Sequence, residues 1–101
     1  MNQYFTVYAT DKPGQQDVRE RVRPAHRLYL RRPGEHRVVV RIGGPTWDRG
    51  GARMNGTLLV VEAASIEEVQ AFVADDPYVQ AGLFECLEVR PWSWGLGNPE
   101  L

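Results

Sequence analysis

The spacing of apolar residues changes along this chain, and this change limits the possible folds more than any other feature. In residues 4–10 apolar and polar side chains alternate, which is the period of a β-strand. Strand patterns are predicted for residues 4–10, 36–42, 56–62 and 83–90, and Pro91 is expected to end the last of them. Between them lie two stretches of helical spacing.

The first helical stretch covers residues 15–32 and contains a proline. Its apolar residues, Val18, Val22, Ala25 and Tyr29, recur at helical spacing. Pro24 removes one helical hydrogen bond, so we expect two helical pieces or one kinked helix. A new N-terminal turn near Pro24 would place His26 in the first turn after the break.

The second helical stretch begins after Ser65, a good N-cap, and has a predicted buried stripe of Ile66, Val69, Phe72 and Val73. The element order is therefore β-α-β-β-α-β, which is the ferredoxin-like α+β arrangement with a four-stranded antiparallel sheet. Right-handed crossovers would put both helices on one face of the sheet. The segment 46–55 is polar and contains glycine, which predicts an exposed loop.

The uncovered face of the predicted sheet is only partly polar, because it would carry Tyr4, Thr6 and Tyr8. A second copy of the chain is the simplest partner, so we expect a homodimer formed through this face. With 101 residues the chain has room for one domain, predicted at residues 1–91. The tail, residues 92–101, holds Trp92 and Trp94, which we expect to pack on the domain or on the dimer partner.

Charge and composition argue against several classes of partner. A formal net charge of −1 gives no electrostatic reason to bind nucleic acid or an anionic membrane. No apolar run approaches the roughly 20 residues that span a bilayer, and no signal peptide is visible, so a cytoplasmic location is predicted. No Cys/His cluster has metal-ligand spacing, and Cys86 is expected to be buried and inert.

Two residues stand out as candidates for chemistry, and each has an ordinary structural explanation. His26, near the expected helix start, would be kept neutral by the helix dipole and could act as a base. It could equally be a packed histidine with no task. Asp76 precedes Pro77 and could simply be an N-cap. His36 is expected at an exposed strand end, and Gly43-Gly44-Pro45 is not a phosphate loop, since no Gly-Lys-Ser/Thr follows.

Several short motifs, taken in order, resemble one family. They are Asp11-Lys12, Arg23-Pro24-Ala25-His26, Gly44-Pro45, Gly56-Thr57, the segment ADDPYVQAGLFE at 74–85, and Val89-Arg90-Pro91-Trp92. Their order and spacing resemble the YciI-like (YCII-related) family of the dimeric α+β barrel superfamily, over nearly the whole predicted domain. The loop 46–55 and the segment 32–36 depart from the family pattern.

The resemblance implies a ferredoxin-like fold that dimerises through its sheets, and a catalytic His-Asp pair carried here by His26 and Asp76. The residues at the matching motif positions that we expect to bind substrate are Arg23, Gly44, Pro45, Thr57 and Tyr78. Some relatives act on chlorinated aromatics as dehydrochlorinase-type enzymes. The chain is thus expected to be a cofactor-free isomerase or lyase acting on a small carbonyl compound or aromatic-derived acid, with backbone amides near Gly44 stabilising a developing enolate oxygen.

Two other functions stay open from the sequence. The chain could be a non-catalytic module that binds a small acid or aromatic ligand in the same cleft, or a purely structural dimeric protein. The enzyme hypothesis requires His26 and Asp76 to lie within direct or single-water contact of each other.

Overall fold

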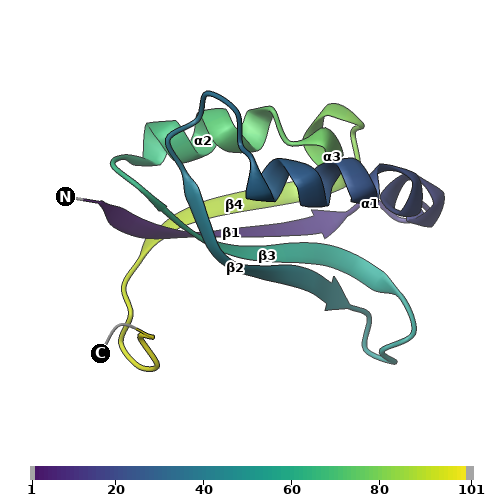
Figure 1. Ribbon diagram of the computed structural model, residues 1–101. Coiled ribbons are helices and arrows are strands. Elements are labelled where there is room, and N and C mark those ends of the chain that lie inside the picture. Colours follow the sequence, from purple (N-terminus) through teal and green to yellow (C-terminus); the bar gives the residue numbers. More distant parts are fainter. Residues whose placement is uncertain (1, 100–101) are drawn as a thin grey trace.

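A sheet of four antiparallel strands carries all the helices on one face, as the computed structural model shows for residues 2–99 (Figure 1). The strands are β1 (Gln3–Asp11), β2 (Val39–Trp47), β3 (Met54–Ala63) and β4 (Phe84–Trp92), in the spatial order β2-β3-β1-β4. The helices are α1 (Gln16–Arg31), α2 (Ile66–Ala74) and the four-residue α3 (Pro77–Gln80). The predicted ferredoxin-like α+β fold is confirmed. None of the helices within residues 2–99 is long and apolar enough to cross a membrane.

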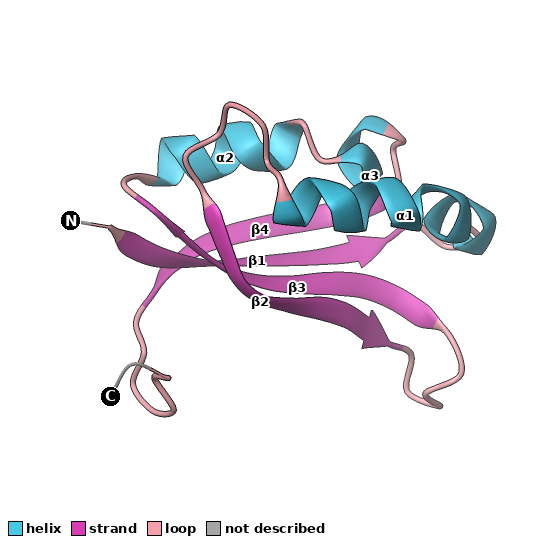
Figure 2. Ribbon diagram, in the orientation of Figure 1, coloured by secondary structure: helices cyan, strands magenta, loops and turns pink. Residues whose placement is uncertain are grey.

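The core lies between the sheet and the helices, and alternation along the two central strands builds it. Phe5 and Val7 of β1 are paired with Val61 and Leu59 of β3, so all four side chains face the helices. From the helix layer, Phe72 packs on them with no exposed surface. Each such large side chain contributes about 1.5–3 kcal/mol by leaving water. Figure 2 shows the helices gathered on this face and no helix on the other, which we call the bare face.

The helix α1 is a single element that runs through Pro24, which corrects the prediction for His26. Pro24 is exposed, so water can hydrate the carbonyl of Glu20 that loses its helical donor. His26 consequently lies in the interior of the helix and not in a first turn, and the helix-dipole argument for its neutral form does not apply. Its environment is set by side chains instead.

The strands extend further than their sequence patterns predicted. β2 continues through Gly43-Gly44-Pro45 to Trp47, and β3 begins at Met54, so the loop predicted at 46–55 shrinks to residues 48–53. β4 likewise continues through Pro91, which does not end it. Both prolines are tolerated because β2 and β4 are the edge strands, where a missing N–H need not face a neighbour. His36 lies before β2 and not within the strand.

Cys86 is exposed, so the prediction of a buried thiol is wrong. In β4 the residues that pack against the core are Leu87 and Val89. Cys86 is paired with Thr10 and its side chain falls on the opposite face. The apolar character of the strand pattern was correct, but the face assigned to the cysteine was not.

The bare face of the sheet carries large apolar side chains. Tyr8 of β1 and Leu58 of β3 are paired there and are 51% and 43% exposed, and Ile42 of β2 is 53% exposed. At one end, the rings of Trp92 and Trp94 lie 4.8 Å apart, and both contact Tyr4 edge-on. The last two residues of the predicted tail, 100–101, lie outside the described residues.

The Tyr29 hydroxyl links α1 to α2 and gives the fold a predicted dependence on alkaline pH. It donates to the carbonyl of Phe72 at 2.6 Å, and burial, together with the charges of Asp75 and Asp76, raises the pKa of Tyr29 to about 12 from 10.0. The folded state therefore holds this proton more tightly than the unfolded chain does. Stability from this group should be fully present below about pH 10 and should fall as the pH rises toward 12.

Tyr29→Phe should lower the free energy of unfolding by about 1 kcal/mol at neutral pH, because one hydrogen bond is lost. It should also flatten the decline above pH 10, as followed by urea denaturation at several pH values. If the free energy of unfolding falls equally above pH 10 in wild type and in Tyr29→Phe, ionisation of the Tyr29 hydroxyl is not the cause.

Candidate functional site

His26 and Asp76 are in direct contact, which meets the condition that the enzyme hypothesis set. Nδ1 of His26, on α1, lies 2.8 and 3.0 Å from the two carboxylate oxygens of Asp76. Both residues are only 5% exposed. Asp76 is also the N-cap of α3, since its Oδ1 accepts from the backbone N–H of Tyr78 at 2.9 Å. The cap and the histidine partner are thus one and the same carboxylate.

This contact fixes which nitrogen of His26 carries a proton. An ionised carboxylate can only accept, so Nδ1 must donate to it, and the unprotonated nitrogen of the neutral ring is Nε2. The ring also stacks on Tyr78, with centroids 3.9 Å apart and planes 19° apart. Its plane and its tautomer are therefore both held, and Nε2 is the basic atom.

A second polar group, centred on Arg19 of α1, lies beside this pair. Arg19 forms a two-pronged ion pair with Asp11, Nε to Oδ2 at 2.6 Å and Nη2 to Oδ1 at 2.8 Å. Its Nη2 also donates to Thr57 Oγ1 at 3.0 Å, and its Nη1 to the Tyr78 hydroxyl at 3.4 Å. The guanidinium carbon sits 4.6 Å from the centre of the Tyr78 ring. One buried cation therefore organises two hydroxyl groups.

The protonation of these groups follows from their surroundings. Burial alone would lower the pKa of Arg19, but the hydrogen bond to Asp11 and the neighbouring charges outweigh it and raise that pKa. Burial raises the pKa of Tyr78, although Arg19 and Arg23 pull it in the other direction. Tyr78 therefore keeps its proton at neutral pH and remains a hydrogen-bond donor.

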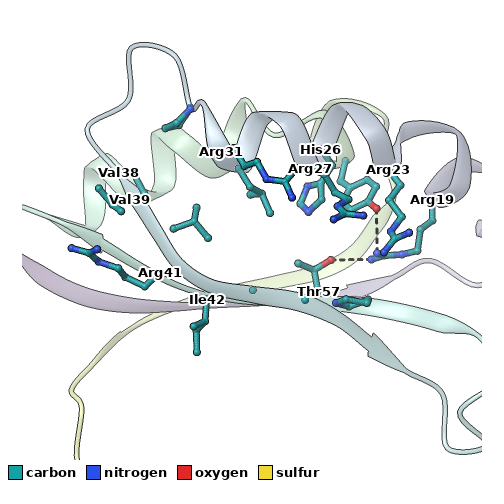
Figure 3. Close-up of a pocket in the computed structure, with 17 residues that line it drawn as sticks. Arg19, Arg23, His26, Arg27, Arg31, Val38, Val39, Arg41, Ile42 and Thr57 are labelled. Carbon is teal, nitrogen blue, oxygen red and sulfur yellow. Dashed lines mark hydrogen bonds between the residues drawn. The ribbon is translucent and has the colours of Figure 1, made fainter. Parts of the chain in front are cut away.

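These side chains open onto a cavity of about 580 Å³ between α1 and β2 (Figure 3). This volume is typical of small-molecule sites. All the predicted substrate-binding residues line it, together with His26; they are Arg23, Gly44, Pro45, Thr57 and Tyr78. Asp76 does not line it and stands behind His26. An apolar wall is formed by Leu30 and Pro33 and by Val38 and Val40.

Glycines shape the strands beside the cavity. Gly43 is paired with Leu59 on the helix side, and a Cβ there would meet Leu59 Cδ2 at 2.6 Å. Gly44 is paired with Leu58, so it presents only backbone to the cavity. At Gly56 a Cβ would lie 2.3 Å from the carbonyl oxygen of Ala9. The glycine of the Gly56-Thr57 motif therefore lets β1 and β3 approach, which sets the position of Thr57.

Sequence reasoning missed most of the charged residues at this site. Asp11 was named only as part of the Asp11-Lys12 motif, with no role at the site, and no role was predicted for Arg19, Arg27, Arg31 and Arg41. The signal was present, because arginine recurs every fourth residue at 19, 23, 27 and 31, which is one side of a helix. The other histidine, His36, pairs with Asp75 at 2.7 Å and does not line the cavity.

No cluster of potential metal ligands is found in the part of the chain that the structure describes. Residues 2–99 contain no group of three or more His, Cys, Asp or Glu side chains placed to hold an ion.

Comparison with known proteins connects the chain to one family. The sequence model of the YCII-related domain matches residues 3–93. The protein YciI of Escherichia coli O6:H1 is 37% identical over 95 residues, covering 87% of this chain and 94% of that protein. An uncharacterised protein of Haemophilus influenzae is 26% identical over 93 residues, covering 88% and 95%.

Among solved structures, a strong similarity is to the 5-chloro-2-hydroxyhydroquinone dehydrochlorinase TftG of Burkholderia phenoliruptrix AC1100, in complex with 2,5-dihydroxybenzoquinone. The two chains share 38% identity with a TM-score of 0.80, covering 91% of this chain and 95% of that one. SnoaB of Streptomyces nogalater, a cofactor-independent oxygenase, has a TM-score of 0.53 at 13% identity, covering 97% of both chains, and shares the fold alone.

The buried pair of Arg19 and Asp11 can be tested by breaking and then removing it. Their side chains are 4% and 8% exposed, so Arg19→Met would leave a buried carboxylate without its cation. We expect a loss of about 3–5 kcal/mol in the free energy of unfolding, measured by urea denaturation.

The double variant Asp11→Leu/Arg19→Met should recover most of this loss, because no unpaired charge remains buried. If the double variant is as unstable as Arg19→Met, the unpaired carboxylate is not the cause.

Proposed function

Because this chain belongs to the YCII-related domain family, we propose that it is a small-molecule enzyme that transfers protons without a cofactor. The reaction is an isomerisation or an elimination of the dehydrochlorinase type, on a small carbonyl compound or an aromatic-derived acid. The observation that carries the proposal is the direct contact of His26 with Asp76 at the wall of a cavity of suitable size.

In this mechanism His26 is the general base. Its Nε2 removes a proton from carbon next to a carbonyl, or from a hydroxyl of a hydroxylated ring, and Asp76 stabilises the imidazolium that forms. The electron pair of a broken C–H bond enters the carbonyl system as an enolate, and the pair of a broken O–H bond stays on oxygen as a phenolate that is conjugated with the ring. In an isomerisation the imidazolium returns the proton to another carbon; in an elimination the pair expels chloride, and the products are HCl and the unsaturated compound.

Tyr78 and Thr57 are the groups we assign to the developing negative oxygen. Each hydroxyl accepts a hydrogen bond from Arg19, and no described residue among 2–99 accepts from either of them. Arg19 thus occupies one lone pair of each oxygen, and neither hydroxyl proton is used by an acceptor within residues 2–99. Such donors, held in place before reaction, stabilise charge at no cost of reorganisation. The amide near Gly44 remains a prediction beside them.

Support for the substrate class comes from the dehydrochlorinase. That relative is 38% identical and its structure contains 2,5-dihydroxybenzoquinone. A planar oxygenated ring of that size fits the chemistry of this cavity, in which an apolar wall faces hydroxyl and guanidinium donors. Arg23, Gly44 and Pro45 are the other residues that we expect to contact such a ring.

We also propose that the protein works in the cytoplasm as a homodimer joined through the bare sheet face. The exposed side chains of Tyr8, Ile42 and Leu58 would be covered by the same face of a second copy. A non-catalytic module that binds the same ligands is the competing function, because Asp76 has a structural task as an N-cap that needs no reaction.

The catalytic proposal predicts proton exchange that depends on His26. Small carboxylic acids and hydroxylated aromatics would first be screened by thermal shift, and those that stabilise the protein would be followed by proton NMR in deuterated water. We expect exchange of an acidic C–H, which His26→Ala slows by about 100-fold or more, because a general base contributes about 10²–10⁴-fold.

Asp76→Asn is the matched second variant. Asparagine caps helices about as well as aspartate, so α3 should stay formed while the charge that supports the imidazolium is lost. Slower exchange at nearly unchanged stability would support the mechanism. Ligands that bind wild type but not His26→Ala, with no exchange and no turnover, would instead establish the binding module.

The dimer proposal predicts that a single substitution on the bare face halves the molecular mass of the particle in solution. Leu58→Arg places a charge in the centre of the bare face, and analytical ultracentrifugation should then find a monomer where wild type is a dimer. Arg49→Gln, in the loop after β2, is the control and should leave the dimer intact. A wild-type monomer at micromolar concentration would refute the interface.

A further inference from the structure

The cavity is bordered by more positive charge than the proposed reaction uses. Arg19, Arg23, Arg27 and Arg31 follow one another at four-residue intervals along α1, and all four line the cavity. Figure 3 shows their side chains extending from the helix toward β2, on the side where His26 also lies. Arg41 stands across from them on β2. Among residues 2–99, none of those that line the cavity is an aspartate or a glutamate.

Two of these five cations are already neutralised within the protein. Arg19 is paired with Asp11. Arg41 is paired with Glu62 of β3, and this hydrogen bond, with a further one from Asn2, lowers the pKa of that carboxyl. Their charges therefore serve the protein's own structure and leave little for a ligand.

Arg27 and Arg31 differ from these two. No carboxylate within residues 2–99 lies at ion-pair distance from either residue; the ion pairs of that part of the chain involve other residues. The helical rise separates them by about 6 Å along the axis, so a single anionic group can reach both guanidinium groups. Like charges at this spacing destabilise a helix slightly, and an anion between them would remove that repulsion.

The surroundings of this pair indicate the rest of the ligand. Leu30 lies on the same helix between them, and Val38 and Val40 lie across from it, in the segment before β2 and at the start of β2. A ligand held here would have an apolar body against these residues, an acidic group at the arginines, and its reacting atoms toward His26.

We propose that Arg27 and Arg31 form an acid-binding subsite that selects substrates carrying an anionic group, a carboxylate or a phosphate, attached to an apolar or aromatic body. This rests on the proposed function, since it specifies the substrate class of the same cavity. Arg27 and Arg31 determine specificity and take no part in the transfer of the proton.

The test compares pairs of ligands that differ only in the anionic group. Hydroquinone and 2,5-dihydroxybenzoate share a ring with two hydroxyls, and phenol and phenyl phosphate provide the phosphate arm. Dissociation constants would be measured by isothermal titration calorimetry on wild type and on Arg27→Gln/Arg31→Gln. The control variant, Arg21→Gln/Arg32→Gln, removes the same charge from residues that do not line the cavity.

We expect wild type to bind at least one anionic ligand about tenfold or more tightly than its neutral partner, because hydrogen bonds between charged groups are gained. The pair of ligands that shows this difference tells whether the subsite prefers a carboxylate or a phosphate. Arg27→Gln/Arg31→Gln should abolish this preference and leave the affinity for the neutral ligand within about twofold, while the control variant keeps the preference.

Equal binding of anionic and neutral ligands by wild type would overturn the subsite, as would an equal loss in the control variant. Failure of the proposed function has a different signature. If the arginine variant loses the preference for acids while His26→Ala leaves proton exchange of the bound acid unchanged, the subsite stands and the catalytic role of His26 falls.

Discussion

One buried carboxylate, that of Asp76, connects the fold of this protein to its chemistry. It begins α3 by accepting the Tyr78 amide, and it holds the imidazole of His26 on α1. A buried carboxylate without partners is very costly, so both contacts are also required by stability. A short turn connects α3 to β4, so the contacts of this one side chain also fix where the chain leaves the helix layer to form β4. The geometry of the candidate base is therefore part of the fold.

Arg19 has the corresponding place beside the ring of Tyr78, on which His26 stacks. It ties Asp11, the last residue of β1, to Thr57 on β3 and to Tyr78 on α3, so three elements meet at one cation. Tyr78 links the two groups, since it stacks on His26 and also lies against the guanidinium. Groups fixed in this way do not have to reorganise when a ligand arrives.

The sequence predicts the element order and the N-cap at Asp76 from local signals, whereas the pairing of Asp76 with His26 follows only from the family resemblance. Alternation marks the strands, and the Asp-Pro step before Tyr78 marks the cap. The sequence leaves open whether α1 breaks or only kinks at Pro24, and it does not predict that β2 continues through Pro45, because solvent exposure and edge position decide these, and both come from the tertiary arrangement. Cys86 was misplaced for a related reason: one residue of strand phase decides which face a side chain occupies. Asp11 and Arg19 meet only because the folded chain brings the end of β1 beside α1.

The two strand prolines have a consequence for how copies of this protein meet. Pro45 lies in β2 and Pro91 in β4, and these are the two outer strands of the sheet. An outer strand offers unpaired backbone groups that another chain could extend into a continuous ladder, as in amyloid. Proline has no N–H and fits poorly in a continuous ladder, so each of these outer strands is a poorer template for another strand. Lateral growth of the sheet into fibrils is thereby discouraged at both edges.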